Sequence, residues 1–372
     1  MFVKSNHLKR PIFGFFIAFT ALILSASMAS AQTTVQADDY PSIQDAIVDA
    51  GCGGTVLLSE KTYAEQFRAL CSVHVIGAGI DKTIIDSTGL YDGFHPAAVF
   101  GPNPFCDPTG VNSLCDTLPP TAAAPCHASC PASGITNITD AYEFASLTLK
   151  TTATPNHILP YIGVGVGWSQ NTNLHDLKVL GYEIGIDTTD SLDANIQNIT
   201  ILGDNSGASA CIEIDPGFMH SPERPQQEGF KISNNNLSTC FSGIFAQTLV
   251  DSSIDHNVIQ QTGRAVNLLG TKELDVHHNI LGPSVVSGVA LRNTSDLSLQ
   301  HNTICQNGIG VQYRASSLIF AGLGFPIPST DNTVHHNAFI GNGVDFSGPE
   351  LTASGNINFK NTSATGICPS PL

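Results

Sequence analysis

The sequence predicts an all-β protein: a single-stranded, right-handed parallel β-helix, that is, a solenoid, capped at its N-terminal end by a short helix. Similar phrases recur along the second half of the chain, and four of the six steps between them are 22 or 23 residues long. Within each repeat, polar and apolar residues alternate over short stretches, as in half-buried strands. A unit of this length cannot bury its apolar side alone, so successive units must stack about 4.8 Å apart as turns of one coil.

One column of the repeat is dominated by asparagine. It comprises Asp176, Asn198, Asn235, Asn257, Asn279, Asn302 and Asn337. Asn tolerates a left-handed backbone and can hydrogen-bond to the same residue one turn away, so we expect this column to form a repeated tight turn. Leucine-rich repeats have a similar period, but their leucine pattern is absent here, and a jelly roll does not repeat at a fixed spacing.

Residues 1–31 have the features of a secretory signal peptide. Lys4, Lys9 and Arg10 precede an apolar stretch at 13–24, which is too short to span a bilayer, and small residues at 29–31 form a cleavage site. A retained membrane anchor is the other interpretation. We expect a secreted or periplasmic protein with no membrane span after cleavage, whose mature chain carries 12 basic and 31 acidic residues.

The chain after the signal peptide divides by composition. Residues 32–90 contain a predicted helix over 41–50, with Ser42 as N-cap and Gly51 after its end, and then the first strands at 55–58 and 73–77. Residues 91–135 form a predicted Cys- and Pro-rich insertion, because they break the period. The β-helix repeats extend over 136–360, and a C-terminal tail follows at 361–372.

All ten cysteines lie after the signal peptide, which favours disulfides in an exported chain. The pairs that we favour are Cys52–Cys71, Cys211–Cys240 and Cys305–Cys368. Cys106, Cys115, Cys126 and Cys130 would then pair among themselves. A cysteine metal site is disfavoured, because no C-x-x-C spacing occurs.

Several phrases resemble the pectate-lyase-like superfamily over residues 40–360. They are S-I-Q-D-A-I, G-G-T-V-L-L, V-H-V-I-G-A-G, K-T-I-I-D and the N-x-I repeats. The resemblance implies a right-handed β-helix. That superfamily includes polysaccharide lyases, hydrolases, uronan epimerases, phage spikes and periplasmic copper-maturation proteins, so fold alone does not assign a reaction. The catalytic motifs of polygalacturonases and pectate lyases are absent, and Ile254-Asp255-His256 matches only part of a pectate-lyase motif.

Setting the repeats in register predicts columns of outward-facing side chains on one sheet. Asp187, Glu213 and Asp215 then lie on neighbouring turns and are the catalytic candidates. Crowded carboxyl groups favour a raised pKa or a bound hard cation, so Ca²⁺ is the one cofactor to consider. The predicted substrate-binding residues are Arg292, Arg314, Gln247, Asn267 and Trp168. The other interpretation is that the acidic side chains belong to the solvated strand face of an acidic protein.

These side chains suit an exported carbohydrate-active protein, a polysaccharide lyase or epimerase that acts on a uronic-acid polysaccharide. A cation or Arg292 would neutralise the sugar carboxylate, and a base would remove the proton at C5. Paired acids also serve glycoside hydrolysis. The alternative is a non-catalytic β-helix that binds glycans or belongs to the cell envelope. Nucleic acid is excluded as a partner because basic clusters are lacking, and we expect a monomer.

Histidines form a second pattern. Five histidines directly precede members of the asparagine column: His175, His256, His278, His301 and His336. His277 and His335 precede two of them. Imidazoles on adjacent turns could bind copper or zinc. The simpler interpretation is a set of polar turn residues that stack between turns, and we therefore expect no metal site there.

Overall fold

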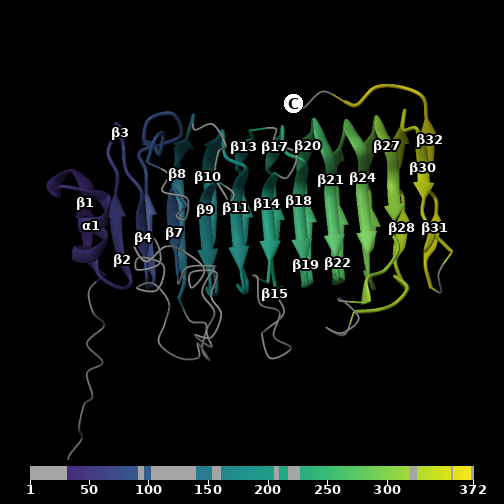
Figure 1. The fold of residues 1–372 in the computed structure, drawn as a ribbon, viewed down its shortest axis with the longest axis horizontal. Helices are drawn as coiled ribbons and strands as arrows, with labels where there is room; N and C mark the ends of the chain where they lie inside the picture. The colour runs from purple at the N-terminus through teal and green to yellow at the C-terminus, as the bar shows by residue number, and fades with distance from the viewer. Residues whose placement is uncertain are drawn as a thin grey trace, which may run out of the picture. The chain divides into compact units, whose positions relative to one another are not determined.

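The structure of the protein is a computed structural model that describes residues 32–90, 96–101, 140–152, 161–204, 209–216, 227–318, 325–352 and 355–369. Across these residues the chain is a right-handed parallel β-helix, with the strands of successive turns stacked side by side (Figure 1). Neighbouring strands pair in parallel, as β11 (Ile184–Thr189) does with β14 (Ala210–Asp215). The predicted fold class is confirmed.

One face of the coil is a 10-stranded sheet of described residues. Along the coil it consists of β4 (Phe67–Ala69), β7 (Ala98–Phe100), β9 (Ile162–Gly167), β11, β14, β18 (Ser242–Gln247), β21 (Thr262–Leu269), β24 (Ser284–Arg292), β27 (Asn307–Tyr313) and β30 (Val344–Ser347). Strand β7 falls within the predicted insertion 91–135, so part of that segment belongs to the coil.

The other strands form a 22-stranded sheet that bends into two rows. The first row holds β1 (Thr34–Gln36), β2 (Gly54–Leu57), β5 (Val73–Ile76), β12 (Asn195–Gln197), β15 (Gln227–Glu228), β16 (Lys231–Ser233), β19 (Leu249–Asp255), β22 (Lys272–His277), β25 (Ser298–Gln300), β28 (Thr333–His335) and β31 (Ile357–Phe359). The second row holds β3 (Thr62–Tyr63), β6 (Ile84–Asp86), β13 (Thr200–Leu202), β17 (Asn236–Ser238), β20 (Val258–Gln260), β23 (Ile280–Leu281), β26 (Thr303–Cys305), β29 (Ala338–Ile340) and β32 (Thr362–Ala364). The long strands β8 (Tyr142–Lys150) and β10 (Asn173–Leu180) pair with both rows.

The bend between the two rows is the repeated tight turn, and the predicted asparagine column occupies it only at Asp176 and Asn198. Left-handed φ angles fall on Asp176, Asn198, Asn234, His256, His278, His301 and His336. Thr200 pairs with Asn236, which aligns Asn198 with Asn234. From Asn235 onward, the expected column therefore lies one residue after the turn position. The histidines take the exposed turn position, which leaves the following asparagines free to enter the core.

Those asparagines form a buried ladder. The backbone N–H of Asn257 donates to Oδ1 of Asn279 at 2.8 Å, and Nδ2 of Asn257 donates to the same atom at 3.0 Å and to the carbonyl oxygen of Ile232 at 2.9 Å. Asn279 repeats this pattern with Asn302. The expected hydrogen bonding between turns is thus confirmed, and it satisfies backbone groups that the bend leaves without strand partners.

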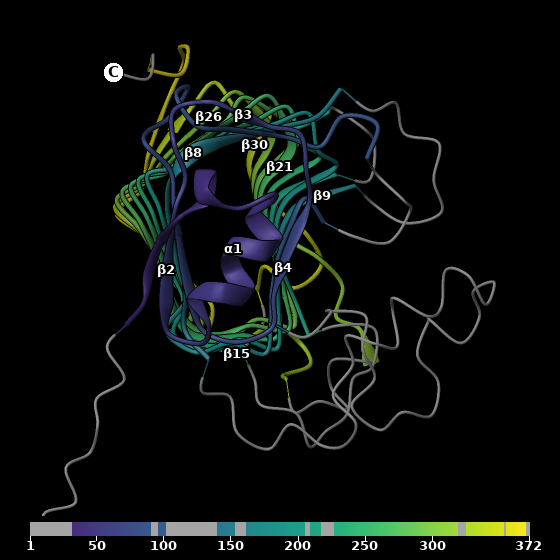
Figure 2. The same cartoon turned by 90° about the vertical axis from the view of Figure 1, so that its left-hand side faces the viewer.

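The predicted N-terminal helix is confirmed as α1 (Ile43–Ala50), which follows the short 3-10 helix η1 (Ala37–Asp39). The Ser42 hydroxyl accepts a hydrogen bond from the Asp45 N–H at 3.0 Å, and Gly51 ends the helix with a φ of 68°. Figure 2 shows α1 lying across the end of the coil. Its buried side chains, which shield the first turn, are Ile43, Ala46, Ile47 and Ala50.

The three disulfides that we favoured are present: Cys52–Cys71, Cys211–Cys240 and Cys305–Cys368. They are typical of an extracytoplasmic compartment. No helix in the described part of the chain is long and apolar enough to cross a membrane. The predicted signal peptide and the cysteines at 106, 115, 126 and 130 lie outside the described residues.

Candidate functional site

The candidate site lies on the outer surface of the 10-stranded sheet. Ile186, Ile212 and Ile244 are fully buried in the core. Side chains alternate along a strand, so the residue that follows each isoleucine points outward. Asp187 pairs with Glu213, and Glu213 pairs with Phe245. The predicted register of this column is confirmed.

Asp187, Glu213 and Asp215 form a group that we call the acidic cluster. Asp187 is only 7% exposed, and burial together with the charges of Glu213 and Asp215 raises its pKa well above the usual range. Burial and the charge of Asp215 raise the pKa of Glu213 to about 8. Within the described residues, neither the Asp187 nor the Glu213 carboxyl group has a hydrogen-bond partner. At neutral pH Glu213 therefore carries a proton.

Asp215 has a different environment. Its Oδ2 accepts a hydrogen bond from Nε2 of Gln247 on the next turn, at 2.9 Å. An amide donor favours the ionised form of a carboxyl group, whereas burial among like charges disfavours it. The cluster thus places the protonated carboxyl group of Glu213 beside the hydrogen-bonded carboxyl group of Asp215, an arrangement that suits proton transfer.

Beyond the acidic cluster, the outward column continues as Phe245, Asn267, Ala290 and Gln312 on successive turns. Phe245 is half-buried and lies between Glu213 and Asn267. An aromatic ring on an outer sheet surface can stack on the apolar face of a sugar. The sequence placed Phe245 in the column but gave it no role. Asn267 is nearly buried, and its Oδ1 has no hydrogen-bond partner among the described residues.

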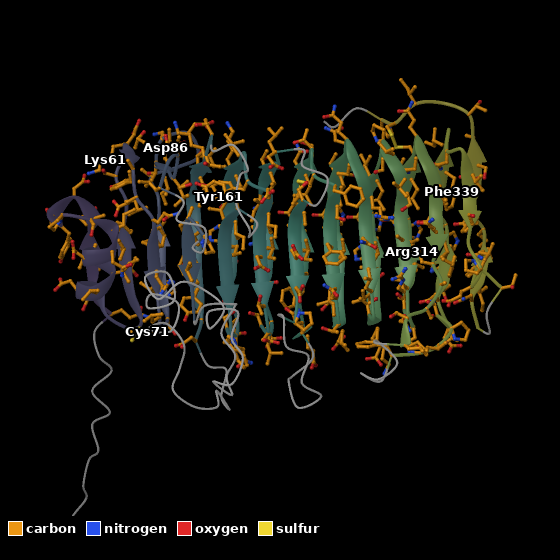
Figure 3. The ribbon with its side chains drawn as sticks, viewed as in Figure 1. Lys61, Cys71, Asp86, Tyr161, Arg314 and Phe339 are labelled. Atoms are coloured by element: carbon orange, nitrogen blue, oxygen red, sulfur yellow. A yellow bond between two sulfur atoms is a disulfide. The ribbon has the colours of Figure 1, made fainter. Side chains whose placement is uncertain are left out.

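Three arginines follow toward the C-terminal end of the face, and we call them the arginine cluster. Leu269 pairs with Arg292 at the end of β24, and Arg314 follows β27 directly. Figure 3 labels Arg314 near the C-terminal end of the coil. Burial and the charges of Arg292 and Arg264 lower the pKa of Arg314 to about 10. In the described part of the chain, no carboxylate contacts any of the three guanidinium groups.

Arg264 is the residue that sequence reasoning missed. It lies near the start of β21, the strand that ends at Leu269, and its guanidinium lies 5.3 Å from the ring centre of Phe241. Burial and the charge of Arg292 lower its pKa. The sequence signal that could have identified Arg264 is the arginine distribution. The chain has six arginines, and three of them fall on consecutive turns of one face.

A loop flanks the arginine cluster and is held in place by Glu350. Its two carboxylate oxygens accept hydrogen bonds from the backbone N–H groups of Ser316 at 2.6 Å and of Ser329 at 2.9 Å. These hydrogen bonds lower the pKa of Glu350 against the effect of burial. Phe325, from the same loop, packs beside Leu269. Phe325 therefore lies against the end of β21.

Trp168 differs from expectation. It directly follows β9, but its side chain is only 5% exposed, so it offers no free ring for a sugar. Burial of this single tryptophan reflects packing at the end of the strand. An open cavity of about 570 Å³ lies on the other sheet, along β16, β19, β22 and β25, and not on the face with the acidic cluster.

The histidines at the tight turn form a continuous stack, which we call the histidine ladder. The rings of His256, His278, His301 and His336 lie 5.2, 5.3 and 5.2 Å apart in sequence order, with interplanar angles of 4°, 16° and 12°. Nδ1 of His277 lies 2.9 Å from Nδ1 of His278, and the same atoms of His335 and His336 are 2.7 Å apart. The stacking expected of turn residues is present.

No three His, Cys, Asp or Glu side chains in the described ranges are arranged to hold a metal ion. Neither the acidic cluster nor the histidine ladder is arranged in this way. The expectation of Ca²⁺ stays a prediction.

Comparison with known proteins places this chain among β-helices. Residues 217–367, less than half of the chain, match the family model "Periplasmic copper-binding protein (NosD)". No curated protein matches the sequence. Among solved structures, the A-module of mannuronan C-5 epimerase AlgE4 from Azotobacter vinelandii is similar over 87% of this chain and 89% of its own, with 14% identity and a TM-score of 0.53.

Two further solved structures are similar. The surface adhesin PfbA of Streptococcus pneumoniae matches 90% of this chain and 92% of its own, with 13% identity and a TM-score of 0.56. DFA-IIIase from Arthrobacter chlorophenolicus A6, in complex with GF2, matches 92% and 86%, also with 13% identity and a TM-score of 0.56. At these identities the likeness shows the pectate-lyase-like fold alone.

Proposed function

We propose that the outer surface of the 10-stranded sheet binds an acidic polysaccharide and transfers a proton at C5 of a uronic acid residue. The observation that carries this proposal is the pair Glu213 and Asp215: a carboxyl group with a pKa of about 8 beside a carboxyl group that accepts a hydrogen bond from Gln247. Perturbed pKa values gather at functional sites, and carboxyl groups with opposed protonation states divide acid and base roles.

In the proposed reaction, Asp215 acts as the base and removes the C5 proton, and a Ca²⁺ ion held by the acidic cluster would neutralise the carboxylate of the reacting sugar and make that proton more acidic. Arg292, about three turns away, binds a neighbouring uronate. Two outcomes follow from the resulting carbanion. In β-elimination, Glu213 donates its proton to the glycosidic oxygen as the C4–O bond breaks and a C4–C5 double bond forms. In epimerisation, a proton returns to C5 from the opposite face, and no glycosidic bond breaks.

The comparisons support both sides of the choice between an enzyme and a binding protein. The similar solved structures include a mannuronan C-5 epimerase and DFA-IIIase, which agrees with chemistry on a glycan. They also include a surface adhesin, which agrees with a non-catalytic β-helix. The protonated state of Glu213 favours the enzyme, because a purely glycan-binding surface has no need of an acidic proton.

A panel of polymers tests the proposal. Polymannuronate, pectate and chondroitin are incubated with the protein at pH 7.5, with and without Ca²⁺. Absorbance near 235 nm reports elimination, proton NMR of the sugar ring reports epimerisation, and released reducing ends report hydrolysis. We propose Ca²⁺ as a counter-ion for the ionised cluster. The effect of Ca²⁺ on activity should therefore increase at pH values above the pKa of Glu213. Binding of a polymer without any product would favour the adhesin-like alternative.

Copper binding is a second candidate function, supported by the histidine ladder. The ladder lies wholly within residues 217–367, the part that matches a family described as periplasmic and copper-binding. Paired Nδ1 atoms at 2.7–2.9 Å, as in His335 and His336, could rearrange around a soft or borderline ion. Titration with Cu²⁺ at pH 7.5, against a variant with His335→Gln and His336→Gln, tests it. A periplasmic location fits this candidate, whereas the polysaccharide reaction also fits a secreted protein.

A further inference from the structure

A second cavity lies on the outer surface of the 10-stranded sheet at its N-terminal end, and we call it the N-terminal pocket. Its volume is about 380 Å³, which is within the usual range of small-molecule sites. Residues from α1, from β4 and its flanks, and from the turn around β7 line it: Gln44, Gln66, Arg68, Leu70, Pro96 and Val99. None of these described lining residues is acidic, although the chain has a formal net charge of −16.

Arg68 faces this pocket because side chains alternate along β4. Phe67 and Ala69 are buried in the core, so Arg68 points outward between them. Gln44 fixes this position: its Nε2 donates to the carbonyl oxygen of Arg68 at 3.0 Å, and its Oε1 accepts a hydrogen bond from the Arg68 N–H at 2.8 Å. Strand β4 is the last of its sheet, and α1 lies beside it at the end of the coil (Figure 2). Arg68 is therefore held on a rigid element, as a binding site requires.

The charge of the N-terminal pocket is the opposite of that in the larger cavity. The cavity of about 570 Å³ on the other sheet is lined by four acidic side chains and one lysine: Asp251, Glu273, Asp275, Asp296 and Lys231. Glu65 lies near Arg68 in sequence, but it does not line the N-terminal pocket, and its Oε2 accepts a hydrogen bond from the Ile43 N–H at 2.8 Å. An anionic ligand is thus attracted to the N-terminal pocket and repelled by the larger cavity.

We propose that the N-terminal pocket binds one uronic acid residue, as an accessory site separate from the acidic cluster. The Arg68 guanidinium pairs with the sugar carboxylate through its planar fork. The side-chain amides of Gln44 and Gln66 offer donors and acceptors for the hydroxyl groups. Leu70, Pro96 and Val99 provide an apolar wall for the C–H face of the ring. The inference rests on the proposed polysaccharide function and adds a second point of attachment for the polymer.

The position of the pocket agrees with an accessory role. Arg68 pairs with Val99, Val99 with Gly165, and Gly165 with Asp187, so Arg68 lies three turns, or about 14 Å, before the acidic cluster. Pro96 packs over Gly165, where an added Cβ would be 2.8 Å from the proline Cγ. This covered turn separates the pocket from the acidic cluster, so the sugar that Arg68 holds is not the one that loses its C5 proton.

Two monosaccharides test the pocket on the wild-type protein, because galacturonate and galactose differ only in the group at C6. The side-chain amide resonances of Gln44 and Gln66 can be followed by NMR at pH 7.5 and 50 mM salt. Galacturonate should shift them at a concentration about tenfold lower than galactose requires, because only galacturonate offers a carboxylate to Arg68. Equal concentrations for the two sugars, or shifts confined to other residues, would overturn the inference.

Substitutions assign the preference to Arg68. Arg68→Gln should abolish the preference for galacturonate and weaken the binding of polygalacturonate about tenfold. Arg68→Lys, which keeps the charge but loses the fork, should abolish most of the preference. Lys231→Gln removes the cation of the larger cavity and is the matched control, which should keep it.

The outcomes separate this inference from the proposed function. An unchanged preference in Arg68→Gln would overturn the accessory site while leaving the polysaccharide function standing. Binding of galacturonate in the pocket, together with no reaction on any uronate polymer, would overturn the proposed reaction and leave the site standing.

Discussion

Asp187 and Glu213 lie directly opposite each other in the pairing of β11 with β14, one turn of the coil apart, and the pKa of each carboxyl group is raised. Burial and the neighbouring charges disfavour the ionised form of both facing carboxyl groups. Asp215, two residues along the same strand, keeps a hydrogen bond from Gln247. Several consequences of this arrangement can be measured.

The raised pKa of Glu213 predicts a stability that depends on pH. Between its ordinary value of 4.5 and about 8, the unfolded chain loses this proton whereas the folded chain keeps it, so stability falls as pH rises through this window. Glu213→Gln should therefore raise the free energy of unfolding by about 2–4 kcal/mol at pH 8 and change it little at pH 4.5. Urea unfolding at both pH values measures this. The exposed Glu273→Gln is the control, and an equal effect of Glu213→Gln at both pH values would contradict the assignment.

Asp215→Asn should abolish turnover, with a loss of at least about 100-fold, because the amide cannot accept the C5 proton. Gln247→Ala should lower kcat by about tenfold, because it removes only the hydrogen bond that holds the carboxylate. Initial rates on the polymer found active in the panel provide the test. Full activity in Asp215→Asn would show that another group is the base.

Arg292→Ala should weaken substrate binding more than turnover. Arg292 lies about three turns from Asp215, so it contacts a neighbouring sugar and not the reacting one. We expect KM to rise about tenfold and kcat to change less than about threefold. Steady-state kinetics over a range of ionic strength measure both quantities. A loss confined to kcat would place Arg292 at the reacting sugar instead.

The sequence was sufficient for the fold because its signals are local and repeated. The spacing of 22 or 23 residues, the alternation within each turn and the cap at Ser42 all follow from short-range chemistry, and the three described disulfides agree with it. The outward column from Asp187 to Gln312 followed from the same register. The tight turn was placed one residue late, because asparagine suits both a left-handed turn and a buried ladder, and only packing decides between them.

The site was less accessible to sequence reasoning. Arg264 was missed because it lies near the start of β21, outside the outward column that includes Asn267 and the end of the strand at Leu269. Burial of Trp168 depends on packing at the end of β9. That burial is not encoded in the spacing of the repeat.

The asparagine ladder predicts a large effect from a small substitution. Asn279→Ala removes the donors to Ile254 O and Asn302 Oδ1 and leaves the backbone N–H of Asn257 without an acceptor. We expect a loss of about 2–4 kcal/mol in the free energy of unfolding. The exposed Asn236→Ala is the control and should cost less than about 1 kcal/mol. Similar losses from both substitutions in urea unfolding would argue against the ladder as a source of stability.

The histidine ladder predicts sensitivity to acid. Burial and the charges of His277, His256 and His301 lower the pKa of His278. As pH falls through about 6.5, the unfolded imidazole gains a proton before the folded one does, so the ladder loses stability toward lower pH. His278→Gln should lower Tm less on acidification from pH 7.5 to 5 than the wild type does. Parallel curves for the two proteins would show that the ladder titrates normally.

The central claim is that the acidic cluster removes the proton at C5 of a uronic acid residue. The most direct test is the release of deuterium into water from a uronate polymer labelled at C5, because release precedes both elimination and epimerisation. We expect release by the wild type and none by Asp215→Asn under the same conditions. Retention of the label in every uronate polymer that the wild type binds would contradict the claim and leave a glycan-binding β-helix.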